Sequence, residues 1–423
     1  MSAPIDFNEC FRTGAEHRSL EEALAQFDAK LATVAGTERV TLREALGRIL
    51  AVDMISLRDI PPHDNSAVDG YAVHFDDVAA EGNTYLARGP RIAAGHPHHG
   101  TIARGTAAQI FTGAPMPMGP DTVVMVEDVT EDRDRILIRR GMLRGSHVRR
   151  AGEDVKRGDT VLRAGLRLRP QDIGMIASLG QTEVEVRRRL RIAVFSTGDE
   201  LREPGETLSA GAIFDINRHT VMAMLDKLGC LVTDLGILPD DAGVIHAALA
   251  AAALGHDLLL TSGGVSQGGE DRVREAVMEL GGVNFWSLGT KPGRVVALGH
   301  VAVAGTSAPF IGLPGNPVAV VVMFLMIARP ILLRLAGANR PARGSFRVPA
   351  GFDFTKKPGR REWLRARLVA SPDGPIAEKF RDDGSGILSS MVATDGLIEL
   401  PEDTVTVRNG DLVDFLPYSE LMG

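Results

Sequence analysis

The sequence has little cysteine, no excess of positive charge and no long hydrophobic run, and each shortage excludes a class of protein. Cys10 and Cys230 are the only cysteines, which excludes a disulfide framework and a thiolate metal cluster. A net charge of −7 argues against broad nucleic-acid binding but permits a local basic pocket for an anionic ligand. The longest apolar run, Val318 to Ala328, is too short to span a bilayer. Because residues 1–20 are polar and lack a signal-peptide core, we expect a cytoplasmic protein with no membrane partner.

The composition is that of a folded protein with several domains. Hydrophobic residues make up 44% of the chain and charged residues 24%. A length of 423 residues exceeds one ordinary core, so we expect about two to four domains.

The first part of the sequence predicts helices followed by a β-rich module. Ser19 with Glu22, and Thr41 with Glu44, form two capping-box patterns, each followed by leucines at helical spacing. The second box predicts a helix that continues to Leu50. From Pro61, short β-like runs such as "DTVVMVE" are interrupted by Gly and Pro, and a further helix is predicted to start at Pro170.

From Arg191 onward, predicted strands alternate with helices. The strands are "RIAVFS", "LVTDLGIL" and "DLLLTS", and the helices are one capped by Asn217, one over 241–254, one over 270–280 and one over 317–335. This alternation indicates a mostly parallel, doubly wound sheet with helices on both faces. After Pro341 the pattern is β again, and Asn409-Gly410 predicts a hairpin between two strands.

Polar loops follow three of the predicted strands. They are "STGDEL", "LPDD" and the glycine-rich "TSGGVSQGGED". The glycines fit either a loose turn or a backbone that approaches an anion closely. Because ligands of such sheets bind beyond the carboxyl ends of the strands, the convergence of three polar loops favours a functional site.

Charged residues in these loops suggest a cation and an anion site. Glu200, Asp240 and Asp271 have the carboxylate oxygens that Mg²⁺ prefers as ligands. The alternative is that the acids of these loops cap the helices that follow, and it is strongest for Asp241, the neighbour of Asp240. Lys291 and Arg294 flank a Pro-Gly turn and can neutralise an oxyanion. The rigid turn of Pro314, Gly315, Asn316 and Pro317 leads into a helix N-terminus, which offers free N–H groups to an anion.

The order of several motifs resembles the molybdopterin molybdenumtransferase family, the bacterial relatives of the gephyrin E domain. These motifs are "DNSAVDGYAV", "TGAP", "RRAGEDV", "FSTGDEL", "SGGVSQGGED", "KPG" and "GLPGNPV". "FSTGDEL" and "SGGVS" alone would also fit the molybdopterin adenylyltransferase family. "DNSAVDGYAV" and "TGAP" lie outside the shared α/β domain and favour the longer enzyme.

The resemblance implies an elongated multidomain chain of the α/β plus β class. It predicts a discontinuous N-terminal domain over 1–60 and 150–188, with a β-rich module inserted over 61–149. It also predicts a central doubly wound α/β domain over 189–338, similar to the adenylyltransferases, and a small C-terminal β-barrel over 339–423.

The resemblance also implies an activity and its residues. The family inserts molybdenum from molybdate into adenylylated molybdopterin with the help of a divalent cation such as Mg²⁺, and releases AMP. By this resemblance Glu200, Asp240 and Asp271 hold the cation and Lys291 stabilises the developing charge. Residues expected to bind the substrate in the central domain are Ser262, Gly263, Gly264, Ser266, Arg294, Pro314, Gly315, Asn316 and Pro317.

In the family the cleft lies at the interface of a homodimer. Asp69, Thr112, Arg149 and Asp154 of the β-rich module match family positions that face the partner's central domain. Arg365 and Ser385 resemble residues near the molybdate pocket. Molybdopterin adenylyltransferase and molybdoenzyme apoproteins are the other expected partners.

Two departures from the family pattern leave alternatives open. Ser287 follows Trp286 where many members carry lysine, and Ala319 stands where many carry serine. A tungstate-preferring paralogue therefore stays open beside the molybdate enzyme. A non-catalytic scaffold like gephyrin is the alternative from another class, and the retained acids favour catalysis over it.

Overall fold

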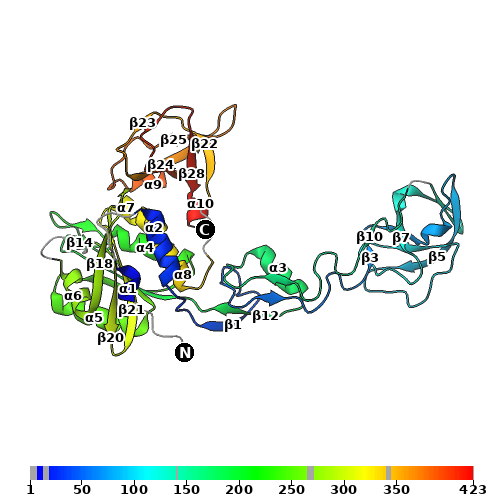
Figure 1. Ribbon diagram of the computed structural model, residues 1–423, viewed down its shortest axis with the longest axis horizontal. Helices are drawn as coiled ribbons and strands as arrows, with labels where there is room; N and C mark the ends of the chain where they lie inside the picture. The colour runs from blue at the N-terminus through cyan, green and yellow to red at the C-terminus, as the bar shows by residue number, and fades with distance from the viewer. Residues whose placement is uncertain (1–6, 13–18, 140–141, 264–270, 340–343, 423) are drawn as a thin grey trace.

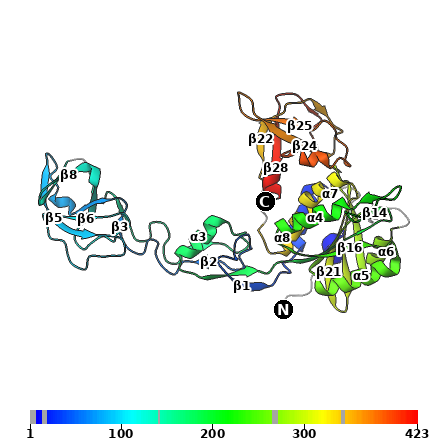
Figure 2. The same ribbon diagram turned by 180° about the vertical axis from the view of Figure 1, so that it is seen from behind.

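The computed structural model has an elongated shape, with a small β module at the end of a narrow arm (Figure 1). It describes residues 7–12, 19–139, 142–263, 271–339 and 344–422. Seen from behind, the arm again separates the module from the body formed by the rest of the chain (Figure 2).

Two N-terminal helices pack on the central domain. They are α1 (Phe7–Phe11) and α2 (Leu20–Lys30), and the predicted capping box of Ser19 and Glu22 is present at α2. Phe11 and Phe27 share a buried cluster with Trp286 of the central sheet. These helices were expected to belong to the discontinuous N-terminal domain. They lie in the central core instead, because their apolar faces are buried there.

The prediction of a helix that starts at Thr41 is wrong. Residues 42–48 form turns, although the Thr41 hydroxyl does donate to Glu44 at 2.8 Å. Gly47 has a φ of 74°, which a helix does not permit, and Leu46 is exposed. Strand β1 (Thr37–Thr41) pairs with β12 (Glu183–Arg187), and Leu50 bridges to Val186 of the same strand, so both ends of the predicted helix pair with β12 instead.

The arm consists of outgoing and returning chain segments paired in short antiparallel ribbons. After β1 and β12 come β2 (Met54–Ile55) with β11 (Thr160–Leu162), then β3 (Asn65–Ser66) with β10 (Val148–Arg149). Helix α3 (Pro170–Ser178) lies beside them and begins where the sequence predicts. The module at the tip is a six-stranded sheet in the order β7-β4-β6-β5-β9-β8. Its strands are β4 (Gly70–Val73), β5 (Thr84–Ile92), β6 (Thr106–Ile110), β7 (Thr122–Met125), β8 (Val129–Asp132) and β9 (Arg135–Ile138).

The central domain is a six-stranded sheet in the order β16-β13-β17-β21-β20-β18. Neighbours among β16, β13, β17 and β21 are parallel, whereas β20 and β18 are antiparallel additions. The mostly parallel sheet expected from the sequence is therefore present. The strands are β13 (Arg191–Thr197), β16 (Leu231–Leu238), β17 (Leu258–Ser262), β18 (Gly281–Ser287), β20 (Val295–Val303) and β21 (Thr306–Leu313).

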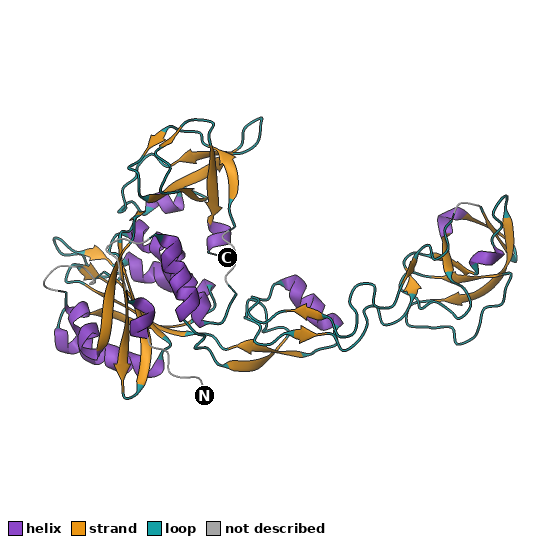
Figure 3. Ribbon diagram, viewed as in Figure 1, coloured by secondary structure: helices purple, strands orange, loops and turns teal. Residues whose placement is uncertain are grey.

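Helices cover both faces of this sheet, as Figure 3 shows. On β17, Leu258 and Leu260 belong to the core beneath α4 and α7, while Leu259 belongs to the core beneath α5 and α6. The helices are α4 (Ile216–Lys227), α5 (Ala242–Gly255), α6 (Arg272–Leu280), α7 (Pro317–Met323) and α8 (Arg329–Leu335). Asp215, not Asn217, caps α4, because its side chain accepts from the N–H of Arg218.

The helical segment Pro317–Leu335 is long and apolar enough to cross a membrane by length and composition. A π-helical turn (Phe324–Ala328) joins α7 to α8 within it. Of its most hydrophobic stretch, 83% is buried inside the protein, so it serves as the core helix of the central domain.

The C-terminal domain is a sheet in the order β19-β24-β26-β28-β22, with β25 paired to β24. The expected hairpin at Asn409-Gly410 is wrong, since β27 pairs with β23 and β28 pairs with β26 and β22. The turn is present, but its two strands enter different sheets. The elements are β19 (Thr290–Lys291), β22 (Phe346–Pro349), β23 (Phe354–Thr355), β24 (Arg361–Val369), β25 (Ile376–Lys379), α9 (Ser389–Val392), β26 (Gly396–Leu400), β27 (Thr406–Val407), β28 (Leu412–Pro417) and α10 (Tyr418–Leu421).

Candidate functional site

One edge of the central sheet gathers most of the loops singled out from the sequence. The last paired residues of β16, β13, β17 and β21 are in register, with Leu238 beside Thr197, and Ser262 beside Leu313. Because β20 starts beside the end of β21 and β18 ends beside the start of β20, the loop 287–295 lies at the same edge. We call this the carboxyl edge.

Buried hydroxyls stand at the ends of two strands there. Ser196, Thr261 and Ser262 are buried, and their hydroxyls have no hydrogen-bond partner among the described residues. Ser196 and Ser262 are register neighbours on β13 and β17. Gly263 follows with a φ of 81°, and its N–H donates to Leu313. The predicted binding residues Gly264 and Ser266 lie outside the described residues.

The acids at the carboxyl edge do not form one metal-binding group. Among the described residues no set of His, Cys, Asp and Glu side chains is close enough to hold a metal ion. Glu200 and Asp240 are exposed, while Asp271 is buried and its carboxylate accepts from the N–H of Arg274 at 3.0 Å. The expected cluster of Glu200, Asp240 and Asp271 is therefore not assembled by this chain alone. Asp271 also caps α6, as Asp241 caps α5 at 2.9 Å.

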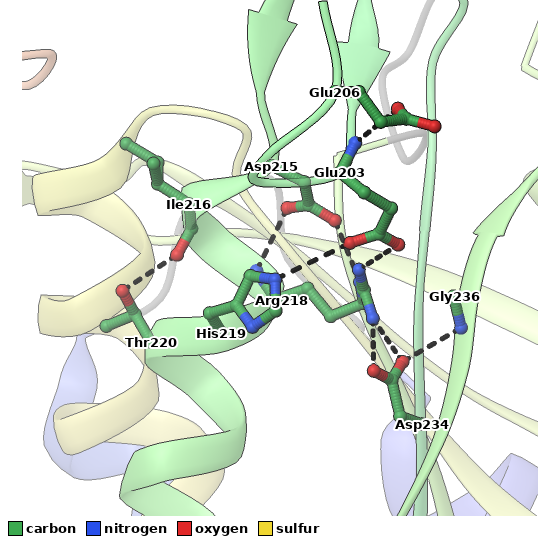
Figure 4. Close-up of polar contacts among 9 residues, drawn as sticks. All are labelled: Glu203, Glu206, Asp215, Ile216, Arg218, His219, Thr220, Asp234 and Gly236. Atoms are coloured by element: carbon green, nitrogen blue, oxygen red, sulfur yellow. Dashed lines mark hydrogen bonds and ion pairs between the residues drawn. The ribbon is translucent and has the colours of Figure 1, made fainter.

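A buried arginine, which the sequence analysis missed, fixes the loop that carries Glu200. Arg218 on α4 is surrounded by Asp215, Asp234 and Glu203, as Figure 4 shows. Burial acts to raise the pKa of Asp234, but hydrogen bonds from the Gly236 N–H and from Arg218 together outweigh it and keep that pKa below its usual value. Asp215 lies three residues before Arg218, at the N-cap of the same helix, but Glu203 and Asp234 come from other segments, so local spacing could have indicated only part of the cluster.

The short ribbon of β14 (Leu201–Arg202) and β15 (Ile213–Phe214) completes this support. The carbonyl of Glu200 accepts from the N–H of Ile213 at 2.8 Å. A Cβ on Gly198 would lie 2.6 Å from the Glu200 carboxylate, so that carboxylate folds back over a position only glycine allows. The Glu200 loop is thus held firmly with its side chain exposed.

The C-terminal domain supplies an ion-pair partner for Lys291. The Lys291 ammonium lies 3.3 Å from the carboxylate of Glu362, a buried residue of β24 that the sequence analysis did not identify. Strand β19 places Lys291 directly beside β24. Arg294 is exposed on the same loop, and its carbonyl accepts from Leu288 at 2.8 Å. Glu362 therefore orients one of the two cations at the carboxyl edge.

The turn of Pro314, Gly315, Asn316 and Pro317 joins β21 to α7. The side-chain amide of Asn217 donates to the carbonyl of Gly315 at 2.7 Å, which ties the turn to α4. Asn316 and Gly315 are exposed, and Asn316 makes no side-chain cap to α7. Pro317, the first residue of α7, has no N–H, and the N–H of Val318 donates to the carbonyl of Ser385 at 3.0 Å, so the helix start offers fewer free donors to an anion than the sequence predicts.

Arg365 and Ser385 have structural contacts in the described chain. The Ser385 carbonyl accepts from the N–H of Val318 at 3.0 Å, which docks the C-terminal domain on α7. The buried Arg365 guanidinium donates to the carbonyls of Asp382 and Gly384, at 2.7 and 3.1 Å. Burial lowers the pKa of Arg365 below its ordinary value. Arg365 therefore shapes the loop next to the edge, and its guanidinium is engaged by that loop.

The remaining predicted residues lie on the distal part of the arm and on its module. Thr112 donates its N–H and its hydroxyl to the Asp69 carboxylate, at 2.8 and 2.7 Å. The N–H of Thr112, then its hydroxyl, hold the pKa of Asp69 below the usual range. Arg149 and Asp154 line one shallow cavity together with Pro61. Figure 1 shows β3, β7 and β10 of this region far from the central sheet, so one chain does not bring these residues to the carboxyl edge.

Comparison with known proteins covers most of the chain. Residues 18–180 match the model of the MoeA N-terminal region (domain I and II), residues 193–334 that of a probable molybdopterin binding domain, and residues 347–418 that of the MoeA C-terminal region (domain IV).

Similar whole proteins agree with these matches. The chain is 37% identical to a molybdopterin molybdenumtransferase of Haemophilus influenzae, over 96% of this chain and 100% of the relative. It is 35% identical to molybdopterin molybdenumtransferase 2 of Mycobacterium tuberculosis, over 88% and 92%. A crystal structure of the molybdopterin biosynthesis moeA protein of Pyrococcus horikoshii matches with a TM-score of 0.81 and 30% identity, covering 95% of this chain and 100% of that one.

Proposed function

The chain belongs to the MoeA family of molybdopterin molybdenumtransferases, and we propose that it inserts molybdenum from molybdate into adenylylated molybdopterin and releases AMP. This is the last step of molybdenum cofactor biosynthesis. The observation that carries the proposal is the carboxyl edge itself, where buried hydroxyls, a tight glycine turn and the loop that carries Lys291 lie at one end of the sheet.

Each of these groups has a task suited to a pyrophosphate substrate. The hydroxyls of Ser196 and Ser262 donate to phosphate oxygens that would otherwise lose hydrogen bonds on burial. Gly263 lets the main chain approach the phosphates without a side chain between them. Lys291, held by Glu362, stabilises the charge that develops as the anhydride bond breaks.

We propose Mg²⁺ or another divalent cation as a bound cofactor. The described residues of one chain do not surround a metal with acids, but Mg²⁺ usually takes only one or two carboxylates together with substrate phosphates. The exposed Glu200 and Asp240 would hold it beside the substrate. When bound, the cation would neutralise charge on the phosphates.

We also propose that the working form is a homodimer. The pair of Asp69 and Thr112 lies on the distal module, remote from the edge of its own chain, and a partner chain's edge is the site it would reach (Figure 1). Oxyanion contacts of Arg365 and Ser385 fit this proposal only if the loop 382–385 rearranges, because it now engages the Arg365 guanidinium. A cytoplasmic location, with molybdopterin adenylyltransferase and molybdoenzyme apoproteins as partners, belongs to the same proposal.

Release of AMP tests this function directly. The purified protein is mixed with adenylylated molybdopterin, molybdate and Mg²⁺, and AMP is measured by chromatography. We expect release by the native chain and a loss on the order of 10² in the Lys291→Gln variant, the scale of one lost electrostatic contact in a transition state. Lys357→Gln removes an exposed lysine elsewhere in the C-terminal domain and should leave the rate unchanged. Absence of AMP, or equal losses in the two variants, would refute the proposal.

A further inference from the structure

A cation-rich cavity lies away from the carboxyl edge, where the arm joins the central domain. Its volume is about 220 Å³, below the roughly 300–1,000 Å³ of pockets for drug-sized ligands, so it suits a small ligand. The segment Arg187–Leu190, which leads from β12 into β13, forms one wall, and the end of α4 with part of α8 forms another. The cationic residues that line it are Arg48, Arg167, Arg187, Arg188, Arg189 and Lys227.

Some of these cations are accounted for within the protein. Arg48 pairs with Glu38, and Arg188 makes two hydrogen bonds of 2.7 Å to Asp257. Arg167 donates to the carbonyl of Lys227 at 3.0 Å, as expected beside the last carbonyls of α4. These contacts give structural reasons for three of the arginines.

Other cations of the cavity are not neutralised by a nearby acid in the part of the chain that the structure describes. Arg189 and Lys227 make no side-chain hydrogen bond or ion pair in the contacts of that part, and Arg187 donates only to the carbonyl of Ala35, at 3.5 Å. Asp226 is the one acid among the described lining residues. The cavity therefore has an excess of positive charge that a small anion would offset.

A neighbouring arginine strengthens this charge imbalance. The Nε of Arg329, at the start of α8, is buried with no hydrogen-bond partner among the described residues. Burial, and then repulsion from Arg167, lower the pKa of Arg329. Burial also raises the pKa of the lining Cys230 thiol to about 12, so the thiol supplies no negative charge near neutral pH.

We propose that this cavity is a binding site for a small phosphate-bearing anion, separate from the substrate site, which ties the root of the arm to α4. Arginine guanidinium groups suit phosphate because their fixed N–H groups can form paired hydrogen bonds to its oxygens. The lining also contains Leu46, Leu228 and Leu333, which would contact a small organic group carried by the phosphate. An anion held by Arg187 and Arg189 on one side and Lys227 on the other would fix the direction of the arm.

Calorimetric titration of the full chain with inorganic phosphate, pyrophosphate and sulfate at constant ionic strength tests the site. We expect saturable binding of phosphate or pyrophosphate, weakened about tenfold in Arg189→Gln and in Arg187→Gln, the scale of a lost charged hydrogen bond. Arg39→Gln is the matched control, because Arg39 lies on β1 of the same arm and its side chain is 70% exposed. Lys291→Gln can lose phosphate binding at the carboxyl edge but should keep the binding that Arg189→Gln loses, which separates this site from the carboxyl edge.

A second readout reports on the arm itself. On addition of phosphate, amide hydrogen exchange should slow at residues 187–190 and 227–230 in the native chain and not in Arg189→Gln. Absence of saturable binding, or equal weakening in Arg39→Gln, would overturn the proposal. Neither measurement requires turnover. A failure of the anion-site proposal can therefore be distinguished from a failure of the proposed molybdenum insertion.

Discussion

Asp69 and Thr112, 43 residues apart, are joined by two hydrogen bonds, from the threonine N–H at 2.8 Å and from its hydroxyl at 2.7 Å. Both donors favour the ionised carboxylate, so the folded-state pKa of Asp69 lies below its ordinary value. The stabilisation from this pair is fully present above the ordinary aspartate pKa of about 3.9 and is lost as the pH falls through the lowered value.

The first prediction follows from this pair. Thr112→Val removes the hydroxyl and keeps the N–H donor, so the pKa of Asp69 should rise part of the way towards the ordinary value. Carboxyl ¹³C NMR titration measures it. Thr101→Val, an exposed threonine of the same module, should leave it unaltered. An unshifted Asp69 in Thr112→Val would mean that the hydroxyl contact does not persist in solution.

The second prediction concerns the shared site. Asp69→Asn and Asp271→Asn should each be nearly inactive, because each damages one half of a site built from two chains. When the two variants are unfolded, mixed in equal amounts and refolded, random pairing should restore about one quarter of native activity, since half of the dimers then contain one intact site. AMP release per chain measures this. No recovery in the mixture, with dimers present by light scattering, would place both residues in the same chain's site.

The third prediction compares two helix caps. Asp271 and Asp241 accept from N–H groups at 3.0 and 2.9 Å, so asparagine should cap either helix about equally well. Asp271→Asn should nevertheless lower turnover by on the order of 10², because a buried charge at the carboxyl edge is lost. Asp241→Asn should retain most activity. Similar rates in the two variants, at similar stability to urea, would exclude a special role for Asp271.

These caps also show what the sequence can predict. Ser19 with Glu22 and Asp241 with Val244 are partners three residues apart, and such local contacts were read correctly. The Thr41 pattern has the same spacing and failed, because Thr41 pairs with Glu183 and the end of the predicted helix, at Leu50, forms a bridge with Val186, both on the distant strand β12. Local chemistry was the same in both cases, and a distant strand decided the outcome.

From the sequence alone, only the part of the site that lies in the loops at the ends of the parallel strands could be predicted. The order of strands and loops places Ser262, Gly263 and the Pro314–Pro317 turn at one edge, because parallel neighbours end together. Glu362 comes from another domain, and no pattern near Lys291 indicates it. The contact of Asp69 with Thr112 was likewise beyond any spacing rule, and only the family resemblance had singled out both residues.

The fourth prediction concerns the stability of the loop that carries Glu200. Arg218→Met would leave Asp215 buried and without its ion pair at 2.9 Å, which should cost about 3 kcal/mol in the free energy of unfolding. Urea denaturation measures it. Adding Asp215→Asn removes the buried, unpaired negative charge and keeps the cap of α4. The double variant should therefore regain part of the lost free energy of unfolding. If the second change gives no recovery, Asp215 is not the group that Arg218 neutralises.

The last prediction concerns Ser287, where many relatives carry lysine. Ser287 ends β18 beside Val295, at the same edge as Lys291, so a lysine there would add a cation near the anion. A neutral hydroxyl binds a dianion more weakly than an ammonium does, by about 1 kcal/mol or more. Ser287→Lys should therefore lower the molybdate concentration for half-maximal AMP release several-fold, leave affinity for the adenylylated pterin unaltered, and lose this gain in high salt.

Arg294 is the natural control, because it is exposed on the same loop and can already supply the missing charge. If it does, Ser287→Lys alone changes little, whereas Ser287→Lys in an Arg294→Ala background restores the affinity that Arg294→Ala removes. Titrating molybdate against the native chain, both single variants and the double variant separates these cases. Tungstate titrations of the same set test whether the departure at Ser287 alters the choice of oxyanion. No effect of lysine in either background would mean that residue 287 lies outside the anion site, despite its place at the end of β18.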